Sequence, residues 1–176
     1  MKAKPGALDD ALFLVDAPDP EGEAGAARRT LSLTEAPSVL LVFAANRYTR
    51  TISRIYQARY GIGAMDWRML VTLTRTPDSS VSQAADLIGI DKAAVSRAIA
   101  RLEARGLVQS RTPGPDARRR LFRLTAEGAA LHDEVLVDAL RLQREMLDGF
   151  SEEEAATLAG LLRRFIDNLD DAGDAG

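Results

Sequence analysis

The sequence predicts a mainly α-helical protein that contains one small β-hairpin. Apolar residues recur at three- and four-residue steps over residues 38–60, 63–77 and 126–170, which is the period of amphipathic helices. Two further helical patterns are separated only by the turn at residues 89–91, and two short alternating runs flank a Pro/Gly turn at 112–117. Helices are therefore expected to form the body, with the hairpin attached to the pair of short helices.

The first 33 residues are expected to form a loosely ordered arm, because prolines and glycines are spread through them. The one compact apolar run, Ala11–Val15, is too short for an independent helix. It either packs against the body, for example at a subunit interface, or has no specific role.

A long first helix is predicted within residues 34–62, where it ends at the Gly61-Ile62-Gly63 break. A second helix follows Gly63, carries Asp66 in its first turn and stops near Pro77. Four of its side chains are expected to point inward: Trp67, Leu70, Val71 and Leu73.

The next two short helices have the spacing of a helix-turn-helix. Ser80 and Gln83 form a capping box for the first, and Asp91 is a good N-cap for the second, which ends at Gly106. Such a motif needs a small residue where the helices touch, a turn residue that tolerates unusual dihedrals and an apolar anchor on the second helix. Three residues meet these needs: Ala85, Gly89 and Val95. A plain helical hairpin in a bundle is the alternative.

Two strands are predicted next, at Leu107–Arg111 and Arg118–Leu124, joined by a turn at Thr112–Ala117. Directly after a helix-turn-helix, such a hairpin is a wing, whose tip reaches the sugar-phosphate backbone or the minor groove of DNA. Arginine suits these contacts because its guanidinium is always charged and forks to two oxygens. Asp116 is placed to orient Arg118 by a charge-assisted hydrogen bond.

Charge is unevenly distributed along the chain. The net charge is −3, yet Asp91–Arg123 carries nine Lys or Arg against three Asp or Glu, a balance of +6, which leaves −9 for the rest. A basic helix-plus-hairpin patch is typical of a DNA-binding face. A solvated surface is the alternative, notably for Arg119 and Arg120. A winged-helix adaptor that binds another protein would explain the acidic body, but it leaves the nine cations without a role.

The composition argues against an enzyme or a metal protein. There is no Cys and a single His, His132, which we expect to be a surface residue because Asp133 and Glu134 follow it. No glycine-rich phosphate loop occurs, so no catalytic residue, metal ligand or cofactor is expected. No run reaches the roughly 18 apolar residues of a membrane span, and Met1–Asp10 lacks the features of a secretory signal, so a cytoplasmic protein without membrane contacts is expected.

The first C-terminal helix is expected to start after its N-cap, Thr125. Its apolar stripe contains Leu131, Val135, Leu142 and Met146, interrupted by Ala139. A second capping box, Ser151 with Glu154, opens a helix with a heptad seam. The seam consists of Ala155, Leu158, Leu162, Phe165 and Leu169.

These apolar surfaces predict a homodimer. A winged domain at residues 63–125 is too small to cover the first helix (34–62) and both C-terminal helices (126–170) on all their apolar sides. A partner subunit is the economical cover, and residues 171–176 are then a tail. Two-fold symmetry would place two recognition helices about one DNA turn apart, so we expect a palindromic operator with half-site centres about 10 base pairs apart.

The order of these elements resembles the multiple antibiotic resistance regulators, the MarR family, over about residues 38–169. "DKAAVSRAIARLEARGLV" is similar to the recognition helix of that family, and "DARRRLFRLTAEG" to its Asp-x-Arg wing, which ends in Leu-Thr before a long helix. The chain departs from the pattern at Gln109-Ser110, where a basic residue often comes sooner than Arg111, and in its long N-terminal arm. The resemblance implies a winged helix-turn-helix domain flanked by N- and C-terminal dimerisation helices. Proteins of that family are homodimeric repressors or activators that bind pseudopalindromic DNA, and many of them release it when a small phenolic or carboxylate compound binds.

We expect Ser96 and Arg97 to reach base edges or phosphates, Arg101 to grip the backbone, and Arg118 to enter the minor groove. The complete expected DNA-binding set is Lys92, Ser96, Arg97, Arg101, Arg111, Asp116, Arg118, Arg119 and Arg120. An effector pocket between the dimer helices and the winged domain would use Arg47, Tyr48, Arg54, Trp67 and Arg68, with a role as a core anchor the alternative for Trp67. Together these expectations describe a homodimeric repressor of nearby genes, released by a small aromatic or carboxylate effector.

Overall fold

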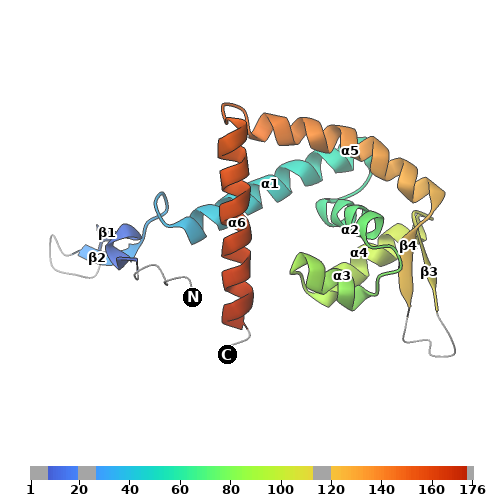
Figure 1. Ribbon diagram of the computed structural model, residues 1–176, viewed down its shortest axis with the longest axis horizontal. Coiled ribbons are helices and arrows are strands. Elements are labelled where there is room, and N and C mark those ends of the chain that lie inside the picture. Colours follow the sequence, from blue (N-terminus) through green and yellow to red (C-terminus); the bar gives the residue numbers. More distant parts are fainter. Residues whose placement is uncertain (1–7, 20–26, 113–119, 174–176) are drawn as a thin grey trace. The chain divides into compact units, whose positions relative to one another are not determined.

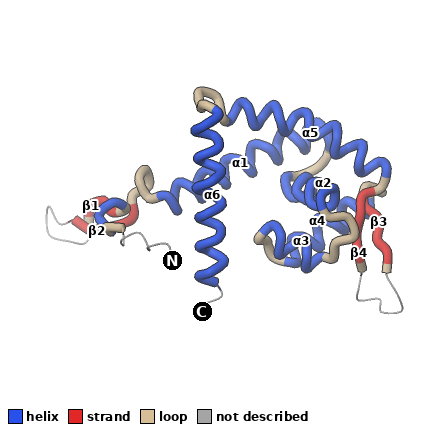
Figure 2. The backbone as a smooth tube through the Cα atoms, in the orientation of Figure 1, coloured by secondary structure: helices blue, strands red, loops and turns tan. Residues whose placement is uncertain are grey.

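The computed structural model describes residues 8–19, 27–112 and 120–173. These residues are mainly helical, with two small antiparallel sheets of two strands each (Figures 1 and 2). In chain order the elements are η1 (Asp10–Leu12), β1 (Leu14–Pro18), β2 (Ala27–Leu31), α1 (Pro37–Tyr60), α2 (Ala64–Arg75), α3 (Val81–Ile88), α4 (Lys92–Ala104), β3 (Val108–Arg111), β4 (Leu121–Leu124), α5 (Ala126–Met146) and α6 (Glu152–Gly173). The chain divides into two compact units, residues 1–69 and 70–176. The predicted fold class, mainly α with a small hairpin after a helix-turn-helix, is confirmed.

The N-terminal arm contains a hairpin that the sequence did not predict. β1 pairs with β2 from Leu14 opposite Leu31 to Pro18 opposite Ala27. The hydroxyl oxygen of buried Ser32 accepts hydrogen bonds from the backbone N–H groups of Thr34 and Glu35. These bonds fix the chain as it turns toward α1. The pairing was missed because the strands are separated in sequence and β2 is exposed along its whole length, so it lacks an alternating apolar pattern.

Helix α1 has the predicted limits. It starts at Pro37, where a missing N–H costs nothing, and it ends at Gly61, whose φ of 65° lies in the left-handed region that glycine adopts readily. The N–H of Gly63 then donates to Oδ2 of Asp66, 3.0 Å away, at the start of α2. Ile52 and Tyr56 are the buried residues of α1.

The inward face of α2 differs from the prediction at one position. Trp67, Leu70 and Leu73 are buried as expected, but Val71 is only half-buried, and Met69 and Thr72 are buried in addition. Successive helical residues are about 100° apart, so Val71 points away from the line through Leu70 and Leu73.

Helices α3 and α4 and strands β3 and β4, residues 81–124, form what we call the reading head, which lies within the second unit (Figure 1). One side of α4 is buried in the core of the reading head and carries Val95, Ala98, Ile99 and Leu102. Strand pairing runs from Val108 opposite Leu124 to Arg111 opposite Leu121, so β3 starts one residue later than predicted. Residues 118 and 119 of the second predicted strand lie outside the described residues. Phe122 covers the core from β4 and is buried.

Helix α5 corrects one expectation. His132 was expected at the surface, but it is only 9% exposed, and its Nδ1 lies 2.9 Å from a carboxylate oxygen of Asp133. The three- and four-residue steps from Gly128 through His132, Val135 and Asp138 to Leu142 place it on the buried face of the helix. Met146 of the predicted apolar stripe is exposed within one chain.

Helix α6 starts with the predicted capping box. The Ser151 N–H donates to Oε2 of Glu154 (2.8 Å), and the Glu154 N–H donates to Oγ of Ser151 (3.1 Å). Phe165 of the predicted seam is half-buried, and five other large apolar side chains of α6 are exposed within one chain: Leu158, Leu161, Leu162, Ile166 and Leu169. None of the helices in the described parts of the chain combines the length and apolar character that a bilayer crossing needs.

Candidate nucleic-acid interface

The helix-turn-helix is fixed by hydrogen bonds that the local sequence dictates. The Gln83 N–H donates to Oγ of Ser80 (3.2 Å), while Oε1 of Gln83 accepts from the Ser80 N–H (2.9 Å). At the turn, Gly89 has a φ of 64°, which a side chain would strain. Oδ1 of Asp91 accepts from the Ala94 N–H (2.8 Å) and so starts α4. The angle between the two helices is therefore set by short-range interactions.

The exposed side of α4 holds the residues expected to read DNA. Lys92, Ser96, Arg97 and Arg101 are all exposed, opposite the buried face of the helix. The small side chains of Ala93 and Ala100 are also exposed on this side. Small residues between long polar ones permit the helix backbone to approach a groove wall closely. This arrangement is suited to insertion of α4 into a major groove.

The wing carries three described arginines, Arg111 on β3, Arg123 on β4 and Arg120 just before β4, and each has an acidic partner. Nε of Arg111 donates to Oδ1 of Asp78 at 2.9 Å, and Nε of Arg123 donates to the same oxygen at 2.8 Å. A second nitrogen of Arg123 contacts Oδ2 of Asp78. These two guanidiniums hold the pKa of Asp78 well below its usual 3.8, at about 2, with Arg123 the larger cause.

Arg120 has a different acidic partner, at the end of α4. Its Nη2 lies 2.7 Å from Oε1 of Glu103, and the same nitrogen donates to Oγ of Ser110 at 2.7 Å. The Ser110 hydroxyl in turn donates to Oε1 of Glu103 at 2.8 Å. The guanidinium also lies over the ring of Phe122, 5.1 Å from its centroid.

The nine expected DNA-binding residues therefore fall into three groups. Lys92, Ser96, Arg97 and Arg101 share the exposed side of α4. Arg111 lies on β3, Arg120 directly precedes β4, and both are paired with carboxylates. Asp116, Arg118 and Arg119 lie outside the described residues. Sequence reasoning missed Asp78 and Glu103, because ion pairs between residues far apart along the chain leave no local pattern.

The wing is joined to α5 by a close backbone contact. Thr125 accepts the Gly128 N–H at its hydroxyl (3.0 Å) and donates to the carbonyl oxygen of Gly106 (2.7 Å). A Cβ at Gly128 would collide with the carbonyl group of Leu107. Glycine at this position is thus a packing requirement rather than a turn requirement.

The five expected effector residues all lie within the first unit. Trp67 is buried and packs edge-on against Tyr56, with ring centroids 5.9 Å apart, as expected of a core anchor. Arg68 donates to the hydroxyl of Thr49 (3.2 Å). Arg47 lies over the ring of Phe43, 5.5 Å from its centroid, and Arg54 is exposed.

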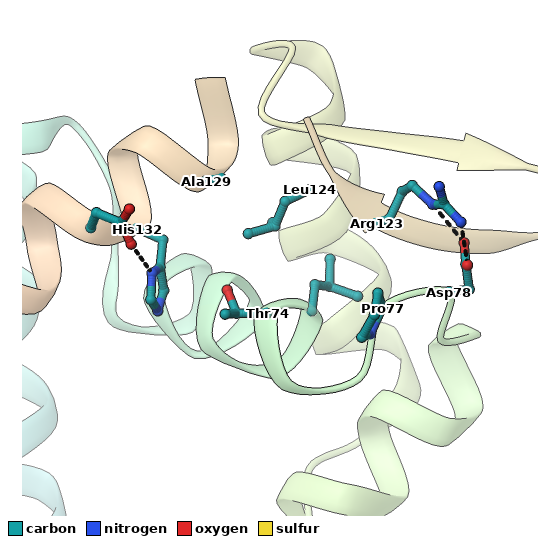
Figure 3. Close-up of a pocket in the computed structure, with 9 residues that line it drawn as sticks. Thr74, Pro77, Asp78, Arg123, Leu124, Ala129 and His132 are labelled. Carbon is teal, nitrogen blue, oxygen red and sulfur yellow. Dashed lines mark hydrogen bonds and ion pairs between the residues drawn. The ribbon is translucent and has the colours of Figure 1, made fainter. Parts of the chain in front are cut away.

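A cavity of about 410 Å³ lies instead within the second unit (Figure 3). Its walls are the end of α2, the loop after α2, strand β4 and the start of α5. Leu73, Pro77 and Leu124 give it an apolar side, while the pair His132 with Asp133 and the pair Asp78 with Arg123 border it. Among the described residues, no cluster of His, Asp or Glu could hold a metal ion.

The fold and this surface define a winged helix-turn-helix transcriptional regulator. A sequence profile of the MarR family matches residues 60–119. The chain is 33% identical over 106 residues to the HTH-type transcriptional repressor NicR of Pseudomonas putida, covering 58% of this chain and 67% of NicR. The chain belongs to the MarR family, whose members are transcriptional regulators that bind DNA rather than enzymes.

Solved structures of related proteins agree with this assignment. A MarR/EmrR family regulator from Acinetobacter sp. ADP1 superposes with a TM-score of 0.74 at 28% identity, covering 80% of this chain and 99% of that one. BpsR of Bordetella bronchiseptica, whose DNA binding is regulated by 6-hydroxynicotinic acid, has a TM-score of 0.70 at 25% identity and covers 78% of this chain and 98% of its own. About a fifth of this chain therefore has no counterpart in these structures.

Proposed function

We propose that this protein is a homodimeric repressor that binds a pseudopalindromic operator and is released by a small aromatic or carboxylate effector. The observation that carries the proposal is the exposed side of α4, where Ser96, Arg97 and Arg101 stand among alanines on a helix whose other side is buried. Direct base reading requires a rigid helix with such an accessible polar side. We infer repression, rather than activation, from the similarity to the repressor NicR.

Dimer formation is inferred from the terminal helices. Ile166 and Leu169 of α6 are 55% and 56% exposed, and three further leucines of α6 are exposed with them. A contiguous apolar stripe of this kind on a soluble regulator is typical of a subunit interface. We infer that residues 34–62 and 126–170 form the dimer interface, that residues 63–125 form the DNA-binding domain, and that residues 1–33 are an arm added to it.

The central experiment selects operator DNA from a random pool with the wild-type protein and measures binding at two salt concentrations. The recovered site is expected to be an inverted repeat with half-site centres about 10 base pairs apart. Arg97→Ala is expected to weaken binding by about 1–3 kcal/mol per half-site and to relax selection at the bases it reads. Arg29→Ala, which removes an exposed cation from β2, outside the proposed dimer and DNA-binding segments, is the matched control and should leave the recovered sequence unchanged.

The wing residues outside the described parts of the chain enter the same experiment. Arg118, braced by Asp116, is proposed to contact the minor groove, and Arg119 to contact phosphate. Arg118→Ala is expected to cost about 1–3 kcal/mol per half-site, and Arg119→Ala to reduce the salt dependence of binding by about one phosphate contact. Recovery of no DNA sequence by the wild-type protein would favour the alternative, an adaptor that binds another protein.

Effector control is proposed from the similarity to BpsR. Two places compete for an aromatic acid: the set Arg47, Tyr48, Arg54, Trp67 and Arg68, and the cavity of about 410 Å³ in the second unit. Ala129 lines that cavity and is exposed, so Ala129→Phe should fill it. Release of operator by 6-hydroxynicotinic acid that is abolished in Ala129→Phe and retained in Arg54→Ala would assign the cavity, and the reverse would assign the other set.

A further inference from the structure

We propose that Asp78 and Glu103 are positioning residues for DNA recognition, two carboxylates that hold the wing at a fixed angle to the helix-turn-helix. This inference rests on the DNA-binding function proposed above and assigns it two residues that contact no DNA. Each carboxylate binds one side chain from the β3 side of the hairpin and one from the β4 side.

Asp78 lies in the loop between α2 and α3 and binds the hairpin from there. It binds Arg111 of β3 and Arg123 of β4 and so bridges the two strands. The φ of Asp78 is 64°, the one left-handed non-glycine conformation among the described residues. Aspartate tolerates this conformation better than most side chains do, and here it aims the carboxylate at the wing.

Glu103 grips the hairpin from the last turn of α4. It accepts from Ser110 of β3 and pairs with Arg120, the residue that precedes β4. Because α4 is also the helix with the exposed DNA-reading side, Glu103 links that helix directly to both sides of the wing. The side chain of Glu103 is 32% exposed, so these bonds compete with water and are not required for core packing.

The two carboxylates act on opposite faces of the hairpin. Residues directly opposite each other share a face, and residues two apart on one strand do so too. Arg123 lies opposite Gln109 and therefore shares a face with Arg111. Ser110 lies opposite Phe122, on the other face, with Arg120 two residues before Phe122. Rotation of the wing toward either face would stretch one of the two sets of bonds.

The loop that carries Asp78 also fixes the first helix of the reading head. The Phe122 N–H donates to the carbonyl oxygen of Ser79 (2.9 Å), which adds the loop to the edge of β4. The following residue, Ser80, is the N-cap of α3. Three consecutive residues thus have three roles: Asp78 binds the wing side chains, Ser79 binds the wing backbone, and Ser80 caps the start of α3.

A purely electrostatic role predicts a different outcome from positioning. If Asp78 only lowered the positive charge of the wing, its removal would raise affinity for every DNA sequence, because two guanidiniums would be released to contact phosphate. If it sets the angle of the wing, its removal should weaken binding to the operator while binding to unrelated DNA stays equal or rises. The ratio of the two affinities separates the alternatives.

The test compares Asp78→Asn, Glu103→Gln and the double variant with Asp86→Asn. Asparagine is nearly isosteric with aspartate and also tolerates a left-handed backbone, so the loop should keep its conformation. Asp86 is exposed on α3, and its neutralisation makes the same charge change in the reading head. Each variant is titrated with the operator selected by the wild-type protein and with a scrambled duplex.

We expect Asp78→Asn to lower the ratio of operator affinity to scrambled-DNA affinity by about tenfold or more, as for the loss of one or two wing contacts per dimer. Glu103→Gln should act in the same direction, with the largest fall in the double variant. Asp86→Asn should change both affinities alike and leave the ratio unchanged. An unchanged ratio in Asp78→Asn and Glu103→Gln, with intact operator binding by the wild type, would overturn the proposal.

A second measurement needs no DNA and therefore separates this proposal from the proposed function. The chain has no cysteine, so Ser82→Cys on α3 and Gln109→Cys on β3, both at exposed positions, can carry two spin labels without background. The distribution of distances between the two spin labels should be narrow in the protein with Asp78 and Glu103 and broader in the double variant. The two proteins are compared under conditions where each still melts cooperatively. Equal widths would refute positioning even if the protein binds DNA, and so would loss of cooperative melting in both single variants, because the carboxylates would then hold the fold itself.

Discussion

The reading head and α6 differ in how far their apolar and charged side chains find partners within one chain. In the reading head, one side of α4 is buried, and the wing arginines pair with Glu103 of α4 or with Asp78 of the loop just before α3. Helix α6 has an equally regular cap, but its large apolar side chains stay exposed within one chain. A module that is complete by itself presents a defined polar surface to a ligand, whereas a helix that is incomplete by itself needs a second subunit.

The largest expected contrast is between two leucines. Leu102 is fully buried in the reading head, so Leu102→Ala should lower the free energy of unfolding by about 2–5 kcal/mol. Leu169→Ala should change it by less than about 0.5 kcal/mol at dilutions where the chain is monomeric, because Leu169 is exposed there. Urea denaturation measures the first effect, and sedimentation of Leu169→Ala should detect weaker self-association. Equal losses of unfolding free energy in the monomer would break the contrast.

Two helical glycines should respond to the same added methyl group with opposite signs. Gly128→Ala forces a Cβ against the carbonyl group of Leu107 and is expected to cost about 1–3 kcal/mol. Gly160 of α6 has no atom within 4 Å of an added Cβ, so Gly160→Ala should stabilise the helix by about 0.5–1 kcal/mol. Thermal melting of both variants checks the signs, and a stable Gly128→Ala would show that the junction between wing and α5 can shift.

A smaller difference in stability is expected between the two capping boxes. Ser80→Ala removes the cap of α3 and should lower the global free energy of unfolding by about 1 kcal/mol. Ser151→Ala removes an equivalent cap, but it should chiefly raise local opening of the first turn of α6, seen as faster amide exchange at residues 152–155. A global loss of equal size in Ser151→Ala would mean that α6 unfolds together with the reading head.

The smallest expected effect is an acid dependence that arises from Asp78, in the loop just before the reading head. The pKa of Asp78 is lowered from 3.8 to about 2, so its ionised form favours the folded state. This contribution is complete above about pH 4 and is lost as the pH falls toward 2. The free energy of unfolding of the wild type should therefore fall more steeply between pH 4 and 2 than that of Asp78→Asn. Parallel curves would contradict the lowered pKa.

Local chemistry explains what the sequence predicted well. The limits of α1, the two capping boxes and the turn at Gly89 depend on residues at most a few positions apart, and all were predicted. The interactions of Asp78 span 33 and 45 residues, so no short pattern reveals them. The burial of His132 was missed because acidic neighbours in sequence were given more weight than its place on the apolar face of α5.

The same limit applies to the candidate interface. The exposed residues of α4 could be named from helical periodicity, because one side of that helix is visibly apolar in sequence. The partners of Arg111 and Arg120 depend on strand register and on a loop conformation, which composition does not encode. The four arginines among residues 116–128 therefore indicated a basic surface, without revealing that Arg120 and Arg123 are held by carboxylates.

The left-handed backbone at Asp78 has a consequence for how this protein can change over evolutionary time. Glycine and asparagine fit that conformation as well as aspartate does, so drift to either would leave the loop intact and the protein foldable. Only the carboxylate would disappear. A descendant could in this way lose its discrimination between promoters by a single nucleotide change while its abundance in the cell stayed the same.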